Sequence, residues 1–264
     1  MGKDYKMKII PMLDERNGCS SYIIGDEFRG SGVVIDPLRT IGYQKYIITA
    51  SQNGISIKEV IESHVHADHY SASKELARAL GIKPSLSKVA PAKFEFNPLR
   101  DGDTFDMGFV KIRVMDTPGH TPDSVSLIVS DESRSKAPWC VFTGDSLFVG
   151  DIGRPDLVFS AEEDIRQASF DQYNSIFEKL LELPDFVEIY PAHSGSSACG
   201  GIFLSHKFSS TIGFEKKFNI FTTEKNKLEF SKKLLRNMKL QPENANEIRD
   251  WNLSPELYDF PLEA

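Results

Sequence analysis

Short apolar runs separated by Gly, Asn and Pro dominate the first part of the chain. Four of these runs are rich in Ile, Val, Met and Tyr and predict strands, which cover residues 7–13, 19–25, 33–35 and 57–61. Turns are predicted at Asn17-Gly18 and at residues 29–32, and Asp36-Pro37 ends the third run. The pattern therefore predicts an opening meander of three strands and, later, a further buried strand.

Apolar residues at helical spacing mark other segments. They predict helices over residues 41–53, 70–80, 161–183 and 222–237. Residues 83–129 instead alternate short apolar runs with turn residues, which is the pattern of a second sheet. After the last predicted helix we expect an irregular tail that continues to Ala264.

Neither an internal repeat nor a linker-like stretch divides the chain. We therefore expect one domain over residues 1–264, with its core over about residues 7–219 and a helical tail over about residues 220–264. The chain has 264 residues, of which 40% are hydrophobic and 11% aromatic, and this content is ample for a sizeable core.

The charge of the chain bears on its partners. A net charge of −7 gives no general attraction to phosphate backbones or anionic lipid, so we expect a small-molecule ligand and neither nucleic acid nor membrane. No apolar run approaches membrane-spanning length, and the first residues lack the apolar core of a signal peptide, so we expect a cytoplasmic protein.

The three cysteines are far apart and form no Cys-x-x-Cys pair, which fits a reducing compartment. Cys140 lies inside an apolar run and is expected in the core, and Cys19, beside a turn, is expected to be structural. Cys199 follows His193 in a Gly/Ser stretch, so it either faces a substrate cavity or is a small buried thiol.

The densest chemistry follows the strand predicted at residues 57–61. His64, His66 and His69 lie within six residues of one another together with Asp68. Imidazole and carboxylate donors suit zinc, iron or manganese, and a loop at a strand end can turn several donors toward one point. The alternative is a group of surface histidines beside an acidic residue.

Matching donors downstream favour the metal site. His120, Asp145 and His193 each follow an apolar run and stand beside Gly or Pro, which makes a sharp turn inexpensive. Because every donor follows a predicted strand, we expect four strand ends to converge on one edge of the molecule. The residue types predict a metal site but do not identify the metal.

Taken together, His64-x-His66-x-Asp68-His69, Gly119-His120, Gly144-Asp145 and Pro191-Ala192-His193 resemble the metallo-β-lactamase superfamily. This resemblance implies an α/β (α+β) fold, a four-layer αββα sandwich with metal-binding loops at one end, here followed by the C-terminal helical extension. In the superfamily these positions allow two metals. One would be held by His64, His66 and His120, the other by Asp68, His69 and His193, with Asp145 between them.

A closer resemblance is to the persulfide dioxygenases of the ethylmalonic encephalopathy type, above all to the branch often fused to a rhodanese domain. It is carried by residues 62–69, 117–121, 143–148, 153–157 and 195–200. The resemblance implies a single iron(II) held by His64, His120 and Asp145. Two histidines and one carboxylate leave open positions on iron for a persulfide sulfur and dioxygen.

The same resemblance implies oxidation of a thiol persulfide, such as glutathione persulfide, by O2 and water to sulfite and the thiol. His66, Asp68, His69 and His193 would then surround the metal site, where they orient ligands and shuttle protons. We expect Asp68, His69, His193 and Cys199 to contribute to catalysis. Arg154 either forms a structural ion pair with Asp156 beneath the metal loop or binds substrate.

Three functions of different classes stay open at this point. The leading one is the iron persulfide dioxygenase. The second is a binuclear zinc hydrolase of the hydroxyacylglutathione hydrolase (glyoxalase II) type, in which two Zn2+ activate water. The third is a sulfane-sulfur binding or sensing protein without turnover. A homo-oligomer and a separate rhodanese partner are also compatible with the sequence.

Overall fold

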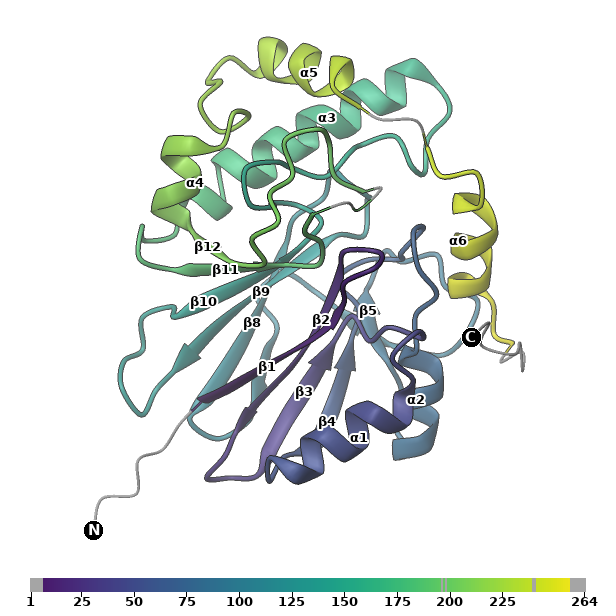
Figure 1. Cartoon of the computed structure of the whole chain (residues 1–264), viewed down its shortest axis with the longest axis vertical. Helices are drawn as coiled ribbons and strands as arrows, with labels where there is room; N and C mark the ends of the chain where they lie inside the picture. Colours follow the sequence, from purple (N-terminus) through teal and green to yellow (C-terminus); the bar gives the residue numbers. More distant parts are fainter. Residues whose placement is uncertain (1–6, 196, 198, 239–240, 257–264) are drawn as a thin grey trace.

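The computed structural model describes residues 7–195, 197, 199–238 and 241–256. Two mixed sheets of six strands each form its centre, and helices lie on their outer sides (Figure 1). The strands of the first sheet, in spatial order, are β1 (Met7–Asp14), β2 (Cys19–Asp26), β3 (Ser31–Ile35), β4 (Ser56–Ile61), β5 (Ser85–Ser87) and β6 (Asn97–Leu99).

The second sheet has its strands in reverse chain order. They are β12 (Ser210–Thr211), β11 (Glu188–Pro191), β10 (Cys140–Gly144), β9 (Val125–Asp131), β8 (Val110–Asp116) and β7 (Thr104–Asp106). The helices are α1 (Tyr43–Gln52), α2 (Ser73–Leu80), α3 (Glu162–Phe177), the 3-10 turn η1 (Leu180–Glu182), α4 (Ile212–Phe218), α5 (Lys227–Arg236) and α6 (Ala245–Leu253).

Three apolar clusters define the layers. The central cluster joins the inner faces of the two sheets, for example Ile24 of β2 with Leu127 of β9. Tyr46 of α1 packs on the outer face of the first sheet. Ile176 of α3 and Phe230 of α5 pack on the outer face of the second. The expected four-layer αββα architecture is therefore confirmed.

Most predicted elements are present, with shifted ends. Helix α2 begins at Ser73 rather than at residue 70, because residues 70–72 run beside residues 37–39: Arg39 N donates to Tyr70 O and Ala72 N donates to Pro37 O. The helix predicted over residues 161–183 ends at Phe177 and continues only as the separate turn η1.

The prediction of an irregular tail is wrong for α6. Its sequence contains Asn and Asp, which are weak helix formers, but Ile248, Trp251 and Leu253 are buried and give the segment a packed face. Residues 257–264 of the predicted tail lie outside the described residues. Helix α4 is an element that the sequence analysis did not assign.

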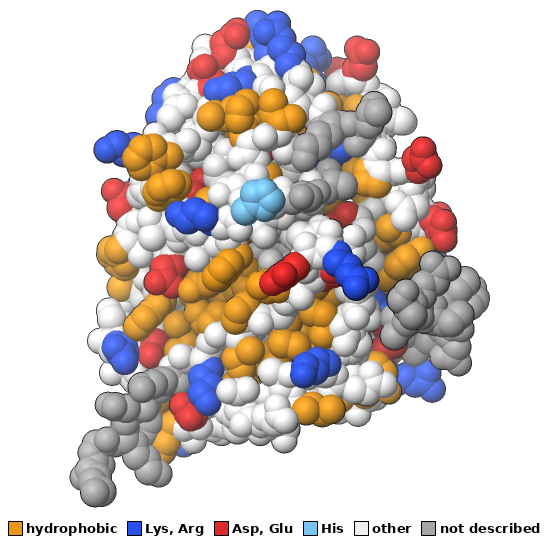
Figure 2. Space-filling model, viewed as in Figure 1, with side chains coloured by type: hydrophobic (Ala, Val, Ile, Leu, Met, Phe, Trp, Pro, Cys, Tyr) orange, Lys and Arg blue, Asp and Glu red, His pale blue; other side chains and the backbone are white. Residues whose placement is uncertain are grey.

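Hydrophobic side chains gather in a band across the middle of the face shown in Figure 2, and acidic and basic side chains are interspersed around it. Among the described helices, none combines the length and the apolar character needed to cross a lipid bilayer.

Candidate metal centre

The predicted donors follow four strand ends. His64 follows β4, His120 follows β8, Asp145 follows β10 directly, and His193 follows β11. The turn before Asp145 depends on Gly144, which has a φ of 51°, in the left-handed region that favours glycine. A Cβ atom there would lie 2.6 Å from Ser63 Oγ. This close approach brings the loops after β4 and β10 together.

His64, His120 and Asp145 form one buried group whose candidate ligand atoms all lie within 4.8 Å of one another. Asp145 Oδ2 is 3.3 Å from His120 Nε2 and 3.8 Å from His64 Nε2. Each of these three atoms is buried without a hydrogen-bond partner among the described residues. Since unpartnered buried polar atoms are costly, their convergence fits a bound metal cation.

The far side of the His64 ring is held by a short chain of hydrogen bonds. Its Nδ1 lies 3.0 Å from Ser63 Oγ, which donates to Asp36 Oδ2 at 2.8 Å. Asp36 Oδ1 also accepts from Ser63 N at 2.6 Å. Asp36 has a φ of 49°, unusual for a residue other than glycine, so its backbone is bent to present this carboxylate. Contacts of this kind orient metal ligands.

The His120 ring is also held on the side away from the group. His120 Nδ1 donates to the carbonyl oxygen of Arg154 at 2.7 Å, which leaves Nε2 free on the inner side. The Arg154 guanidinium is buried and pairs with Asp156 through two hydrogen bonds of 2.7 and 2.8 Å. The expected ion pair is therefore confirmed, and the role of Arg154 in substrate binding stays a prediction.

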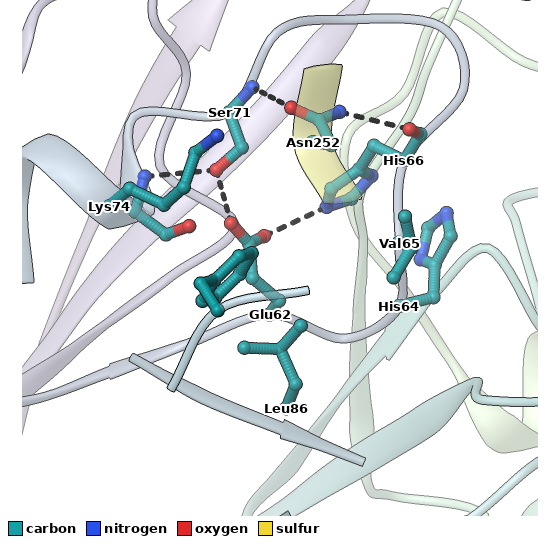
Figure 3. Close-up of a pocket in the computed structure, with 10 residues that line it drawn as sticks. Glu62, His64, Val65, His66, Ser71, Lys74, Leu86 and Asn252 are labelled. Atoms are coloured by element: carbon teal, nitrogen blue, oxygen red, sulfur yellow. Dashed lines mark hydrogen bonds and ion pairs between the residues drawn. The ribbon is translucent and has the colours of Figure 1, made fainter. Parts of the chain in front are cut away.

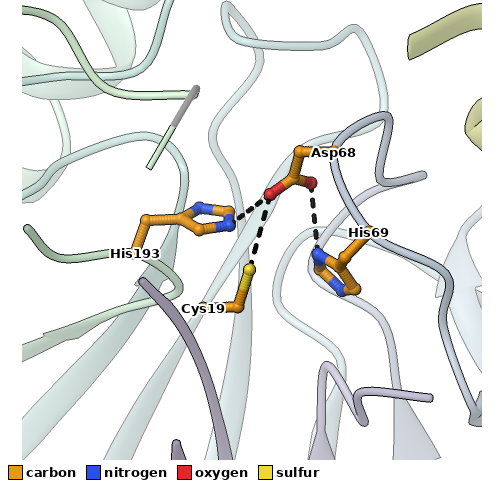
Figure 4. Close-up of side chains that lie close together, drawn as sticks. All are labelled: Cys19, Asp68, His69 and His193. Carbon is orange, nitrogen blue, oxygen red and sulfur yellow. Dashed lines mark hydrogen bonds and ion pairs between the residues drawn. The ribbon is translucent and has the colours of Figure 1, made fainter. Parts of the chain in front are cut away.

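A second group lies beside the first (Figure 4). It consists of Cys19, Asp68, His69 and His193, whose candidate ligand atoms also lie within 4.8 Å of one another. His193 Nε2 is 2.5 Å from Asp68 Oδ2, and His193 Nδ1 is 2.6 Å from Asp145 Oδ1. His69 Nδ1 contacts Asp68 Oδ1 at 3.1 Å. His193 thus bridges the two groups through a carboxylate on each side.

The charges in the two groups differ. Burial and the nearby charge of His66 hold the pKa of His64 well below its usual range. Burial also lowers the pKa of His120, although Asp145 opposes it. Burial disfavours a charged His193 as well, but Asp145 and Asp68 outweigh it and raise its pKa well above the usual range. At neutral pH His64 and His120 are therefore neutral, the form that binds metals, and His193 is protonated.

For the two carboxylates, nearby charges outweigh burial and favour the ionised form. Burial opposes the ionisation of Asp68, but the charges of His193 and His69 outweigh it and hold the pKa of Asp68 well below its usual range. The pKa of Asp145 is lowered in the same way, chiefly by His193 and His120. Both carboxylates are therefore ionised at neutral pH.

His66 points into a third group. Its Nε2 lies 3.1 Å from Glu62 Oε2 and 3.2 Å from Asp36 Oδ1, and Glu62 also accepts a hydrogen bond from Ser71 Oγ (Figure 3). Burial alone would lower the pKa of His66, but Asp36 and Glu62 raise it well above the usual range. His66 Nδ1 is buried without a described partner.

Two cysteines lie near these groups. Cys199 is buried in an apolar cluster with Phe148 and Leu157, and its sulfur lies within 4.8 Å of donor atoms of Asp145 and His193. Burial raises the pKa of the Cys199 thiol well above its usual range. The buried-thiol interpretation is therefore correct, and a catalytic role for Cys199 stays a prediction. Ser196 and Ala198 of the same stretch lie outside the described residues.

Sequence reasoning missed Cys19 and Asp36 as parts of the site. Cys19 was expected to be structural, yet its sulfur is 3.8 Å from Asp68 Oδ2. The residue is brought there by a backbone bridge between Cys19 and His193, which joins the two sheets and has no local signal in the sequence. The Asp36-Pro37 pair signalled only the end of a strand.

Comparison with known proteins agrees with this arrangement. The profile of the Metallo-beta-lactamase superfamily matches residues 14–193. Persulfide dioxygenase ETHE1 of Bos taurus is 29% identical over 183 residues, which cover 69% of this chain and 66% of that protein. Its Homo sapiens counterpart is 30% identical over 66% of this chain and 63% of that protein. The matches thus span just under two thirds of the length of these relatives.

Two solved structures are also similar. A metallo-beta-lactamase from Staphylococcus aureus subsp. aureus COL has a TM-score of 0.88 and 30% sequence identity, over 95% of this chain and 74% of that chain. ETHE1 from Myxococcus xanthus has a TM-score of 0.76 and 28% identity, over 94% of this chain and 96% of that chain.

These relatives confirm the resemblance to persulfide dioxygenases and indicate an enzyme with a metal cofactor. The superfamily profile covers well over half of the chain, and the two-sheet fold and the histidine-rich strand ends agree with it. The chain belongs to the metallo-β-lactamase superfamily.

Proposed function

We propose that this protein is an iron-dependent persulfide dioxygenase. It would oxidise a thiol persulfide, such as glutathione persulfide, with O2 and water to sulfite and the free thiol. The observation that carries the proposal is the group of His64, His120 and Asp145: two neutral imidazoles and one ionised carboxylate direct toward one point buried atoms that have no hydrogen-bond partner among the described residues. Similarity to the ETHE1 proteins supports it.

These three residues would hold the iron. Iron(II) held by two histidines and one carboxylate would leave open positions for substrate and O2 and would supply redox chemistry, which zinc lacks. Ser63, Asp36 and the Arg154 carbonyl keep the two rings in place from behind. The protein contributes a donor set with fixed orientation and charge.

The neighbouring residues would accept and release protons during the reaction. Oxidation of a persulfide RSSH by O2 and one water gives the thiol RSH, sulfite and two protons, so the site needs groups that accept and release protons. His193 and His69 carry protons beside Asp68, and His193 also fixes Asp145. We assign Asp68, His69 and His193 this role in catalysis, and place Cys199 beside them.

One observation favours the binuclear zinc hydrolase as the second candidate. His66 Nδ1 and His69 Nε2 are buried without described partners, and the group of Cys19, Asp68, His69 and His193 offers donors for a second ion. Against it, the neighbouring carboxylates raise the pKa of His66 and of His193, so binding of a metal to either ring would have to release a proton.

Two measurements test the proposal. Metal analysis of protein purified without added metal should find about one iron per chain, since the proposed site has a single donor trio. The oxygen electrode should register uptake on addition of glutathione persulfide. Two zinc ions per chain with no uptake would favour the hydrolase, and bound persulfide without uptake would favour a sulfane-sulfur binding protein. The cytoplasmic location, a homo-oligomer and a rhodanese partner stay predictions.

A further inference from the structure

Helix α6 packs against the loop that carries His64, His66 and His69, although it lies beyond the residues that match the superfamily profile (Figure 1). Leu253, at its end, belongs to the same apolar cluster as Val65. Ala245, at its start, belongs to the same cluster as Ala67. Val65 and Ala67 flank His66, so each end of α6 shares an apolar cluster with a residue of the loop.

Asn252 of α6 forms hydrogen bonds with three backbone groups of this loop. Its Nδ2 donates to the carbonyl oxygens of His66 and His69, each at 2.9 Å, and its Oδ1 accepts from Ser71 N at 3.0 Å. Figure 3 shows the side chain between the His66 carbonyl and the Ser71 amide. Asn252 is buried, and these three bonds use most of its hydrogen-bonding capacity. The bonded backbone groups lie on both sides of Asp68.

The end of α6 is itself anchored close to the loop. Lys74, in the first turn of α2, donates through Nζ to the carbonyl oxygens of Trp251 at 2.9 Å and Ser254 at 2.8 Å. The same ammonium lies 5.1 Å from the centre of a Trp251 ring. Lys93 N donates to Leu253 O. The end of α6 that carries Asn252 is therefore fixed by hydrogen bonds from α2, which begins just after the loop, and from residue 93.

We propose that Asn252 is a positioning residue, which fixes the backbone from His66 to Ser71 and so the direction of Asp68 and His69. Docking of α6 and binding of metal then stabilise each other, because both need the same loop conformation. This inference rests on the metal centre of the proposed function. It does not depend on which metal binds or on the reaction.

Variants at Asn252 test the first part. Asn252→Ala removes all three bonds, and Asn252→Asp keeps the shape and an acceptor for Ser71 N but has no donor for the two carbonyls. We expect each to weaken cobalt(II) and iron(II) binding by about 10-fold, the lower end of the effect of losing contacts that orient ligands, because Asn252 holds the backbone that follows the ligand His64 rather than the ligand itself. Asn246→Ala, on the exposed side of the same helix, is the matched control and should bind as the parent does.

Hydrogen exchange of the unmodified protein tests the second part without any variant. Addition of cobalt(II) to metal-free protein should slow amide exchange in residues 62–71 and, by reciprocity, in residues 245–253. Protection of residues 62–71 with α6 unchanged would overturn the inference, as would parent-like metal binding by folded Asn252→Asp protein. Protection of neither segment would contradict the metal centre itself. Protection of both without oxygen uptake would contradict only the proposed reaction.

Discussion

Replacement of Asp145 by Asn tests the proposed ligand set, because it removes one negative charge and keeps the size of the side chain. Asp145 is buried and acts in two directions. Its Oδ1 pairs with protonated His193 at 2.6 Å, and its Oδ2 faces His120 Nε2 at 3.3 Å. The substitution therefore weakens an ion pair and removes the only anionic donor of the group.

The expected size of both effects follows from this geometry. Removing one partner of a buried ion pair costs about 3–5 kcal/mol. His193 keeps Asp68 at 2.5 Å, so we expect the lower end, about 3 kcal/mol, for metal-free protein. That loss lowers the melting temperature by about 6–12 °C. Because a ligand is lost rather than a group behind it, iron affinity should fall by more than about 100-fold.

Three assays on Asp145→Asn protein measure these quantities: thermal melting of the metal-free form, iron content after gel filtration, and oxygen uptake with glutathione persulfide. Asp164→Asn, at an exposed position of α3, is the control and should match the parent in all three. Parent-like iron content and uptake in the Asp145→Asn variant would refute the assignment of Asp145 as a ligand.

Three further predictions concern the surroundings of the site. Gly144→Ala places a Cβ 2.6 Å from Ser63 Oγ at a φ of 51°, so both stability and iron affinity should decrease in melting and binding assays. Burial and the charge of His66 lower the pKa of His69, but Asp68 outweighs them and raises this pKa from 6.5 to about 9. The protonated His69 therefore contributes fully to stability below pH 6.5, and the contribution is lost as the pH rises toward 9. Melting of metal-free protein should show this decline, and His69→Gln should reduce it. Arg154→Lys loses the two-bond pair with Asp156. Because this pair supports the metal loop, kcat should fall and KM should change little. A tenfold rise in KM would instead support a role of Arg154 in substrate binding.

Much of the fold could be predicted because its signals are local. Strands such as β2 and β8 are apolar runs bounded by turn residues, and the donors His64, His120 and Asp145 each adjoin a strand end that the same pattern marks. A superfamily pattern then supplies the order of the loops. These two signals were sufficient to predict that the donors converge, as they do in the structure.

The missed features depend on contacts between distant parts of the chain. Asn252 reaches His66 across 186 positions, and nothing near it in the sequence marks it as part of a metal loop. Helix α6 forms through burial of Trp251 and its neighbours rather than through helix propensity. Cys19 lies near Asp68 because the first residue of β2 forms a backbone bridge with His193, two residues after β11.

In the proposed reaction, a single iron site would oxidise the persulfide with O2. The most direct measurement is the ratio of sulfite formed to O2 consumed when iron-loaded protein receives glutathione persulfide, with zinc-loaded protein as the control. We expect one sulfite for each O2 with iron-loaded protein and no O2 uptake with zinc-loaded protein. O2 uptake by the iron form without sulfite, or hydrolysis of an acylglutathione thioester by the zinc form alone, would contradict the proposed iron dioxygenase.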